Sequence, residues 1–148
     1  MLLAQKDVKM KKTRIKRYFR FLPQHSVQAI TMELQPQQSG RTLVLSPAGR
    51  IDHTHADAFK LALDPHLRDC TKDGAALVID FSGVNYISSI GLRALMVAIK
   101  QVKAQGGRMV LAALQPLVLE VFTISRFDML FEIFPDRAAA LAAVGGAS

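Results

Sequence analysis

"LVIDFSGVNYISSIGLRALMVAIKQVKAQGGRMVLAAL", residues 77–114, decides the fold because it holds a strand, a helix and a second strand in succession. The nearly continuous apolar runs at 75–83 and 108–114 are typical of strands covered on both faces. The helix between them is indicated by apolar residues at 3.6-residue spacing: Leu92, Leu95, Met96, Ile99 and Val102. "QGGR" (105–108) supplies a glycine to end it. Buried strands that alternate with helices predict right-handed crossovers and parallel pairing.

The same alternation extends to both sides of this stretch. We predict an α/β fold in the order β-β-α-β-α-β-α-β-α, a single mixed β-sheet covered mainly by α-helices. The predicted strands are 27–34, 42–50, 75–83, 108–114 and 129–134. The turn composition of 36–41 makes the first two strands an antiparallel hairpin, and Pro47 suggests an edge or a bulge near the end of the second.

Three further helices are predicted by the spacing of apolar residues and by their end signals. The first follows Thr54 and Asp57, which resemble a capping box, and Pro65 is expected to kink or divide it. The second, at 115–125, begins with Pro116 at a first helical position, and the last covers 135–144.

Two serines and a glycine stand where the helix after strand 75–83 begins. Ser88 or Ser89 at the N-cap would accept a hydrogen bond from an unpaired amide, worth about 1 kcal/mol. Gly91 costs about as much in helix propensity, which makes sense if a neighbouring backbone or a partner must approach closely. A phosphate on one of these hydroxyls would meet free N–H groups and the positive end of the helix dipole. The residues alone leave a cap and a modified hydroxyl both open.

The net charge of +7 belongs to one end of the chain. Residues 1–25 hold eight basic side chains against Asp7, and the remaining chain is balanced. We therefore expect a basic N-terminal tail at 1–26, either a disordered, solvated leader or a segment that touches anionic surfaces weakly, and no direct DNA binding. Phe19, Phe21 and Leu22 suggest that the end of this segment packs on something.

Motifs of catalysis and metal binding are scarce. His53 and His55 form an HxH beside Asp52, but no third and fourth ligand follows at a recognisable spacing, so a polar turn is the better interpretation. The chain has no GxSxG elbow, and Cys70, its single cysteine, has no partner for a disulfide, which fits a reducing cytoplasm. We expect no catalysis and no cofactor.

The segment 77–114 resembles the STAS domain of bacterial anti-sigma factor antagonists. In that family a strand of the form hhhDhS leads to D-S-[SA]-G-L or S-S-x-G-L and then to a helix that ends in GG. "SPAGRIDHTHADAF" (46–59) looks like the G-[ER]-[IL]-D segment of the family, which ends the second strand. The resemblance extends over about 27–144, where it implies a STAS-like fold with the element order given above, and it leaves 145–148 as a short C-terminal tail.

The resemblance implies a partner switch. The phosphorylated hydroxyl of the family lies two residues before the glycine, which makes Ser89 the acceptor and Gly91 that glycine. The preceding residue is often Asp and here is Ser88, which becomes a rival acceptor. Unphosphorylated, the protein would bind an anti-sigma factor that is also a serine kinase and free a sigma factor, and a phosphatase would reset it. The partner surface assigned in this way consists of Asp52, His53, Tyr86, Ser88, Ser89, Gly91 and Arg93. The alternative is a STAS scaffold subunit of a signalling or lipid-transport complex that is not phosphorylated.

Overall fold

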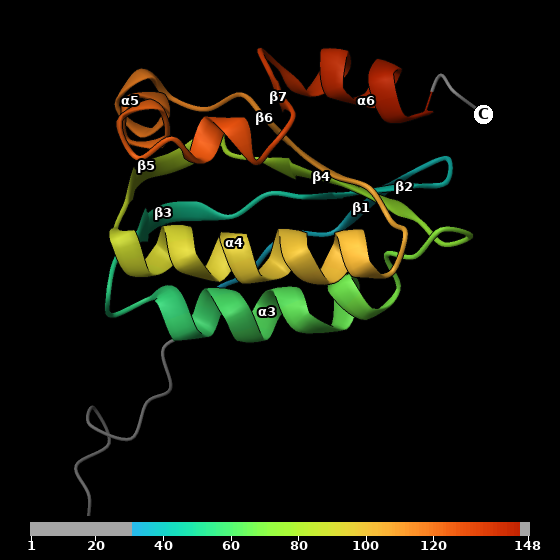
Figure 1. Ribbon diagram of the computed structural model, residues 1–148, viewed down its shortest axis with the longest axis horizontal. Helices are drawn as coiled ribbons and strands as arrows, with labels where there is room; N and C mark the ends of the chain where they lie inside the picture. The colour runs from blue at the N-terminus through green and yellow to red at the C-terminus, as the bar shows by residue number, and fades with distance from the viewer. Residues whose placement is uncertain (1–30, 146–148) are drawn as a thin grey trace, which may run out of the picture.

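The computed structural model describes residues 31–145 of the chain (Figure 1). The predicted basic tail at 1–26, the first part of the predicted strand 27–34, and residues 146–148 lie outside this range.

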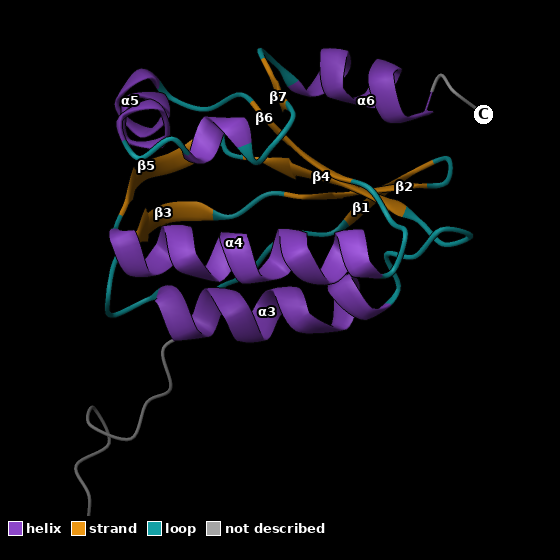
Figure 2. Cartoon of the chain, viewed as in Figure 1, coloured by secondary structure: helices purple, strands orange, loops and turns teal. Residues whose placement is uncertain are grey.

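A five-stranded mixed sheet runs through the centre of the molecule (Figure 2). Its spatial order is β1 (Gln37–Ser39), β2 (Thr42–Leu45), β4 (Ala76–Asp80), β6 (Met109–Ala112) and β7 (Ile133–Phe134). β1 pairs with β2 in the antiparallel sense, and every other pair is parallel. The mixed α/β sheet predicted from the sequence is confirmed.

A second, two-stranded ladder holds β3 (Ala48–Ile51) parallel to β5 (Gly83–Ile87). The strands of this ladder differ in two ways from those predicted from the sequence. The predicted strand 42–50 is interrupted at Ser46 and Pro47, where the missing N–H of proline removes a ladder hydrogen bond. The predicted strand 75–83 ends at Asp80, and β5 was not predicted, because "GVNYI" contains two residues that are depleted in strands.

The hairpin is antiparallel, as predicted, but it lies later in the chain than expected. Residues 31–36 form no strand, and β1 occupies part of the segment 36–41 that was predicted as a turn. Only Gly40 and Arg41 form the turn, with Gly40 at a φ of 61°. The sequence carried no sign of β1 because its three residues are polar and exposed.

Helices cover both faces of the sheet. α3 (Ala56–Arg68) and α4 (Ser89–Ala104) lie side by side on one face, and α6 (Arg137–Gly145) packs on the other, against β4 and β6 (Figure 1). β4 shows why both faces are apolar: Leu77 and Ile79 belong to the large core cluster that includes side chains of α3 and α4, and Val78 belongs to the cluster that includes Ala140 of α6.

The helix ends agree only in part with the sequence. Pro116 begins α5 (Pro116–Ile124), and Gly106, at a φ of 76°, follows the end of α4, both as predicted. The predicted capping box of Thr54 and Asp57 is wrong, since α3 starts after His55 without a side-chain cap. Pro65 does not divide α3, which runs through it as one helix.

The last part of the predicted strand pattern is shorter than expected. The strand predicted at 129–134 is reduced to β7, because a short 3-10 helix, η1 (Phe127–Met129), precedes it. The final helix is two residues later at its start than predicted.

Candidate functional site

The candidate site lies where β3 and β5 end side by side. Ile51 and Ile87 are register partners, and the Ser88 N–H donates to the Ile51 carbonyl at 2.9 Å. A Cβ on Gly91 would lie 2.9 Å from Ile51 Cγ2, from the Ile51 carbonyl oxygen and from Ile87 Cγ1. Gly91 therefore allows the first turn of α4 to sit directly against the end of β3, which is the close backbone approach that its presence suggested.

Ser88 and Ser89 have different environments. Ser88 is the N-cap of α4, half-buried, and its Oγ accepts from the Gly91 N–H at 3.2 Å. Ser89 is the first residue of the helix and is exposed, and within residues 31–145 its hydroxyl makes no hydrogen bond. The capping role falls to Ser88, and the Ser89 hydroxyl is left facing solvent.

Asp52 organises the neighbouring loop between β3 and α3. Its Oδ1 accepts from the backbone N–H groups of Thr54 and His55, at 3.0 and 3.1 Å, and from His55 Nδ1 at 2.7 Å. The hydrogen bond from the His55 ring is the main reason why the pKa of Asp52 falls from 3.8 to about 2. Asp52 is therefore ionised at neutral pH, at the end of β3 beside the start of α4, and His53 next to it is exposed.

Arg50 is a residue of this site that the sequence did not indicate. Its guanidinium lies over the Tyr86 ring, 4.2 Å from the centroid, and its Nε is 3.5 Å from Asp52 Oδ2. The contact with Tyr86 follows from the register of β3 with β5, in which Arg50 and Tyr86 are partners. Since β5 itself was not predicted, no local pattern revealed this pair.

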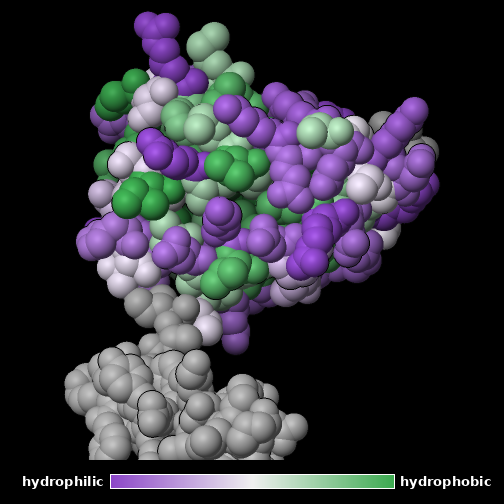
Figure 3. Space-filling model, turned by 60° about the horizontal axis from the view of Figure 1, so that its bottom comes forward, coloured by the Kyte–Doolittle hydropathy of each residue, from purple (hydrophilic) through white to green (hydrophobic). Residues whose placement is uncertain are grey.

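A shallow apolar groove adjoins Ser89 on the helical face of the molecule. Its volume is about 190 Å³, and it is lined by Ala56, Asp57, Lys60, Ile90, Arg93, Ala94 and Val97. Ile90 and Val97 are 51% and 45% exposed, so this face offers apolar surface to a partner. Figure 3 turns the lower side of Figure 1, where α3 and α4 lie, toward the viewer and shows apolar side chains scattered among hydrophilic ones. Arg93, four residues after Ser89, is exposed on the same side of α4.

Asp80, at the end of β4, belongs to a separate polar cluster. Arg137 donates to it from Nε at 2.9 Å, and the Ser82 N–H donates to its other oxygen at 2.9 Å. Arg137 also donates to Gln37 Oε1 and to Ser46 Oγ, at 2.8 and 3.0 Å. Burial raises the pKa of Asp80, but the hydrogen bonds from Ser82 and Arg137 outweigh it and hold the pKa below its ordinary value. This cluster joins α6 to β1, β4 and the loop after β2, and it has a structural role.

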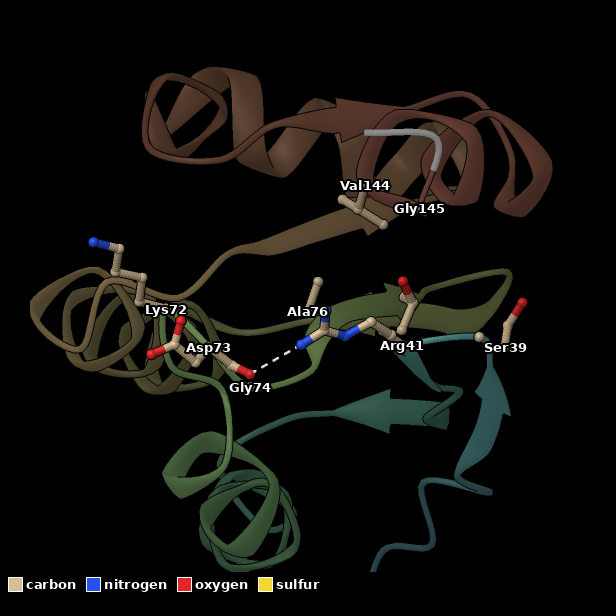
Figure 4. A pocket seen from close by; sticks show the side chains of 10 residues that line it. Ser39, Arg41, Lys72, Asp73, Gly74, Ala76, Val144 and Gly145 are labelled. Atoms are coloured by element: carbon tan, nitrogen blue, oxygen red, sulfur yellow. Dashed lines mark hydrogen bonds between the residues drawn. The ribbon is translucent and has the colours of Figure 1, made fainter. Parts of the chain in front are cut away.

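A second hollow, of about 500 Å³, lies far from the candidate site (Figure 4). It is formed by the β1–β2 turn, the loop before β4 and the end of α6, and Arg41 Nη2 donates across it to the Asp73 carbonyl at 3.2 Å. This hollow is at the amino ends of β2 and β4, whereas Ser89 follows the carboxyl end of β5. The two share no residue.

The described part of the chain gathers no set of three or more His, Cys, Asp or Glu side chains that could hold a metal ion. In the HxH motif, His55 forms a hydrogen bond with Asp52 within the loop. Within the same range, no helix combines the length and the apolar character needed to cross a bilayer.

The family model of the STAS domain matches residues 33–140, and the chain belongs to this family. Proteins named as anti-sigma factor antagonists are among its matches, as the sequence indicated. The protein BtrV of Bordetella bronchiseptica, whose name describes it as an anti-sigma factor antagonist, is 32% identical over 112 residues. The match covers 76% of this chain and 94% of BtrV.

Solved structures agree with this assignment. An anti-sigma factor antagonist from Mycobacterium paratuberculosis has a TM-score of 0.67 and 28% identity, covering 78% of this chain and 94% of its own. The anti-sigma factor antagonist SpoIIAA in its unphosphorylated form has a TM-score of 0.61 and 21% identity, covering 76% of this chain and 96% of its own, a likeness of fold.

Proposed function

We propose that this protein is a partner-switching antagonist of an anti-sigma factor and that the charge state of Ser89 sets the switch. The proposal rests on the different roles of Ser88 and Ser89 at the start of α4. Ser88 caps the helix, so the exposed Ser89 hydroxyl can be modified without removing a hydrogen bond of the fold.

Phosphorylation at this position changes a surface and leaves the fold in place. A phosphate adds about −1.5 to −2 charges at neutral pH. The N-terminus of a 16-residue helix accommodates that charge through its free N–H groups and its dipole. The nearby carboxylate of Asp52 is already paired with Arg50 and His55, so it leaves the added charge of the phosphate as the change at this surface.

The unmodified surface suits a protein partner. The apolar groove beside Ser89 supplies contact area through Ile90, Ala94 and Val97. A neutral hydroxyl enters such a contact at the cost of one hydrogen bond, whereas a phosphate must be desolvated or is repelled. A loss of about 2.8 kcal/mol reduces affinity about a hundredfold, which suffices for a switch.

In this scheme the chain itself performs no chemistry. The partner is an anti-sigma factor with serine kinase activity, which supplies ATP and magnesium, and a phosphatase removes the phosphate. Binding of the unphosphorylated protein frees the sigma factor. We place this exchange in the cytoplasm, in keeping with an anti-sigma factor as partner and with a single unpaired cysteine.

Binding and phosphorylation assays with the cognate kinase-type anti-sigma factor test the proposal. Ser89→Ala should bind with wild-type affinity and resist phosphorylation, and Ser89→Asp should weaken binding about a hundredfold, or about 2.8 kcal/mol. Circular dichroism should show the same fold in both variants.

Ser88→Ala is the matched control, because it removes a hydroxyl one position away. It should still be phosphorylated, although its fold loses about 1 kcal/mol with the cap. Mass spectrometry that finds the phosphate on Ser88 would move the switch by one residue. A kinase that binds the chain but labels neither serine would favour the scaffold alternative.

A further inference from the structure

α5 is mostly apolar, yet much of it faces solvent. Of its nine residues, PLVLEVFTI, only Val118 and Phe122 are buried, and Leu117 and Ile124 are 55% and 74% exposed. Apolar helix faces are normally buried against another element. α5 therefore lacks a cover in the described range.

The exposed apolar surface continues beyond α5. Met129, at the end of η1, is 79% exposed, and Leu130 follows it. Beside them lies a groove of about 550 Å³ whose apolar lining is Leu114, Leu119, Phe131, Ile133, Phe134 and Pro135. We call α5, η1 and this groove the α5 surface.

The α5 surface carries more carboxylates than bases. Residues 115–136 carry four carboxylates and one guanidinium, that of Arg126. Glu132 pairs with Arg108 at 2.8 Å, and Asp136 accepts from the Ala139 N–H. The carboxylates of Glu120 on α5 and Asp128 on the wall of the groove form no ion pair in the described range, so they are available to a basic occupant.

The chain contains a segment of matching character outside the described range. Residues 1–25 hold eight basic side chains, and they end in an apolar aromatic group, "YFRFL" at 18–22. An occupant with apolar rings between cations fits a surface with an apolar groove between carboxylates.

The reach of the segment is sufficient. The described chain begins at Thr31, which lines a hollow together with Ala48, Gly49 and Arg50 of β3. β3 pairs with β5, and β5 contacts α5, so one strand spacing of about 4.8 Å and one packed layer of about 10 Å separate β3 from α5. The nine residues from Leu22 to Thr31 span up to about 30 Å when extended.

From these observations we infer that residues 16–22 dock on the α5 surface of their own molecule, with the aromatic side chains in the groove and the bases beside Glu120 and Asp128. Figure 1 shows α5 on the other side of β3 and β5 from α3 and α4, and the α5 surface shares no residue with the α3–α4 groove at Ser89. The docked segment leaves the Ser89 surface open to the anti-sigma factor.

Trypsin cleavage of the full-length chain tests the inference, because residues 16–20 contain three cleavage sites, Lys16, Arg17 and Arg20. Leu117→Ser/Ile124→Ser should speed cleavage at these sites about tenfold, equivalent to about 1.4 kcal/mol of docking. Leu61→Ser is the matched control: Leu61 is 71% exposed on α3, and its replacement should leave the rate unchanged. As a second readout, Phe19→Ser/Phe21→Ser should shift the methyl resonances of Leu117 and Ile124 but not that of Leu61.

Several results would overturn the inference. Equal cleavage rates in the wild type and the α5 variant would show that the segment does not dock there. Light scattering could instead show a doubled mass for the wild type that the α5 variant loses, with fast cleavage in both proteins. That result would assign the surface to a second copy of the chain. Protection that arises only with anionic lipid vesicles would assign the segment to a membrane.

Discussion

Gly91→Ala tests the contact between α4 and the end of β3. The added methyl would lie 2.9 Å from the Ile51 carbonyl oxygen, a distance that a Cβ does not tolerate. That carbonyl cannot withdraw freely, because it accepts the Ser88 N–H at 2.9 Å. Alanine gains about 1 kcal/mol of helix propensity over glycine. Overpacking costs about 1–3 kcal/mol, and weakening the Ser88 hydrogen bond costs about 1 kcal/mol more.

The balance is a loss of about 1–3 kcal/mol in the free energy of unfolding, and thus a melting temperature lower by about 4–12 °C. Differential scanning calorimetry and urea titration of the two proteins measure it. Lys100→Ala, an exposed change on the same helix, should stay within about 0.5 kcal/mol of the wild type. If Gly91→Ala melts at or above the wild-type temperature, helix propensity outweighs the contact and our explanation of this glycine is wrong.

Two further predictions concern carboxylates. Asp80→Asn should lower the free energy of unfolding by about 1–3 kcal/mol in urea titration, because Arg137 loses the charge of a buried partner. The control is Glu132→Gln, in an exposed pair with Arg108, which should cost only about 0.2–1 kcal/mol. Equal losses in the two variants would contradict the role of burial. The hydrogen bond from His55 lowers the pKa of Asp52 from 3.8 to about 2, so the stabilisation is complete above pH 4 and is lost as the pH falls toward 2. The stability difference between wild type and Asp52→Asn, followed by urea titration, should therefore shrink across this window, and a difference that stays constant down to pH 2 would refute it.

The buried centre of the fold was predictable because its residues carry strong periodic patterns. β4 and β6 are continuous apolar runs, and α4 has apolar residues on one face and a glycine after its end. β1 and β5 were missed for the opposite reason: β1 is polar and exposed, and β5 contains Gly83 and Asn85. Strands that owe their existence to pairing more than to burial leave little trace in a single sequence.

The candidate site was predictable only in outline. The sequence placed Ser88 and Ser89 at a helix start but did not decide which one caps it, since both are good N-cap residues. Thr54 resembled a cap for α3, yet Asp52 two residues earlier receives the N–H groups of Thr54 and His55. The stacking of Arg50 on Tyr86 depends on the pairing of strands more than thirty residues apart, which no local pattern encodes.

The bond between Asp80 and Arg137 links positions 57 residues apart in the chain. During synthesis Asp80 leaves the ribosome long before its counter-ion, and β1, β2 and β4 emerge without the guanidinium that later joins Gln37 and Ser46 to them. A nascent chain stalled before residue 137 should therefore stay loosely assembled and open to proteases, and native resistance should arise in one step when the last helix emerges.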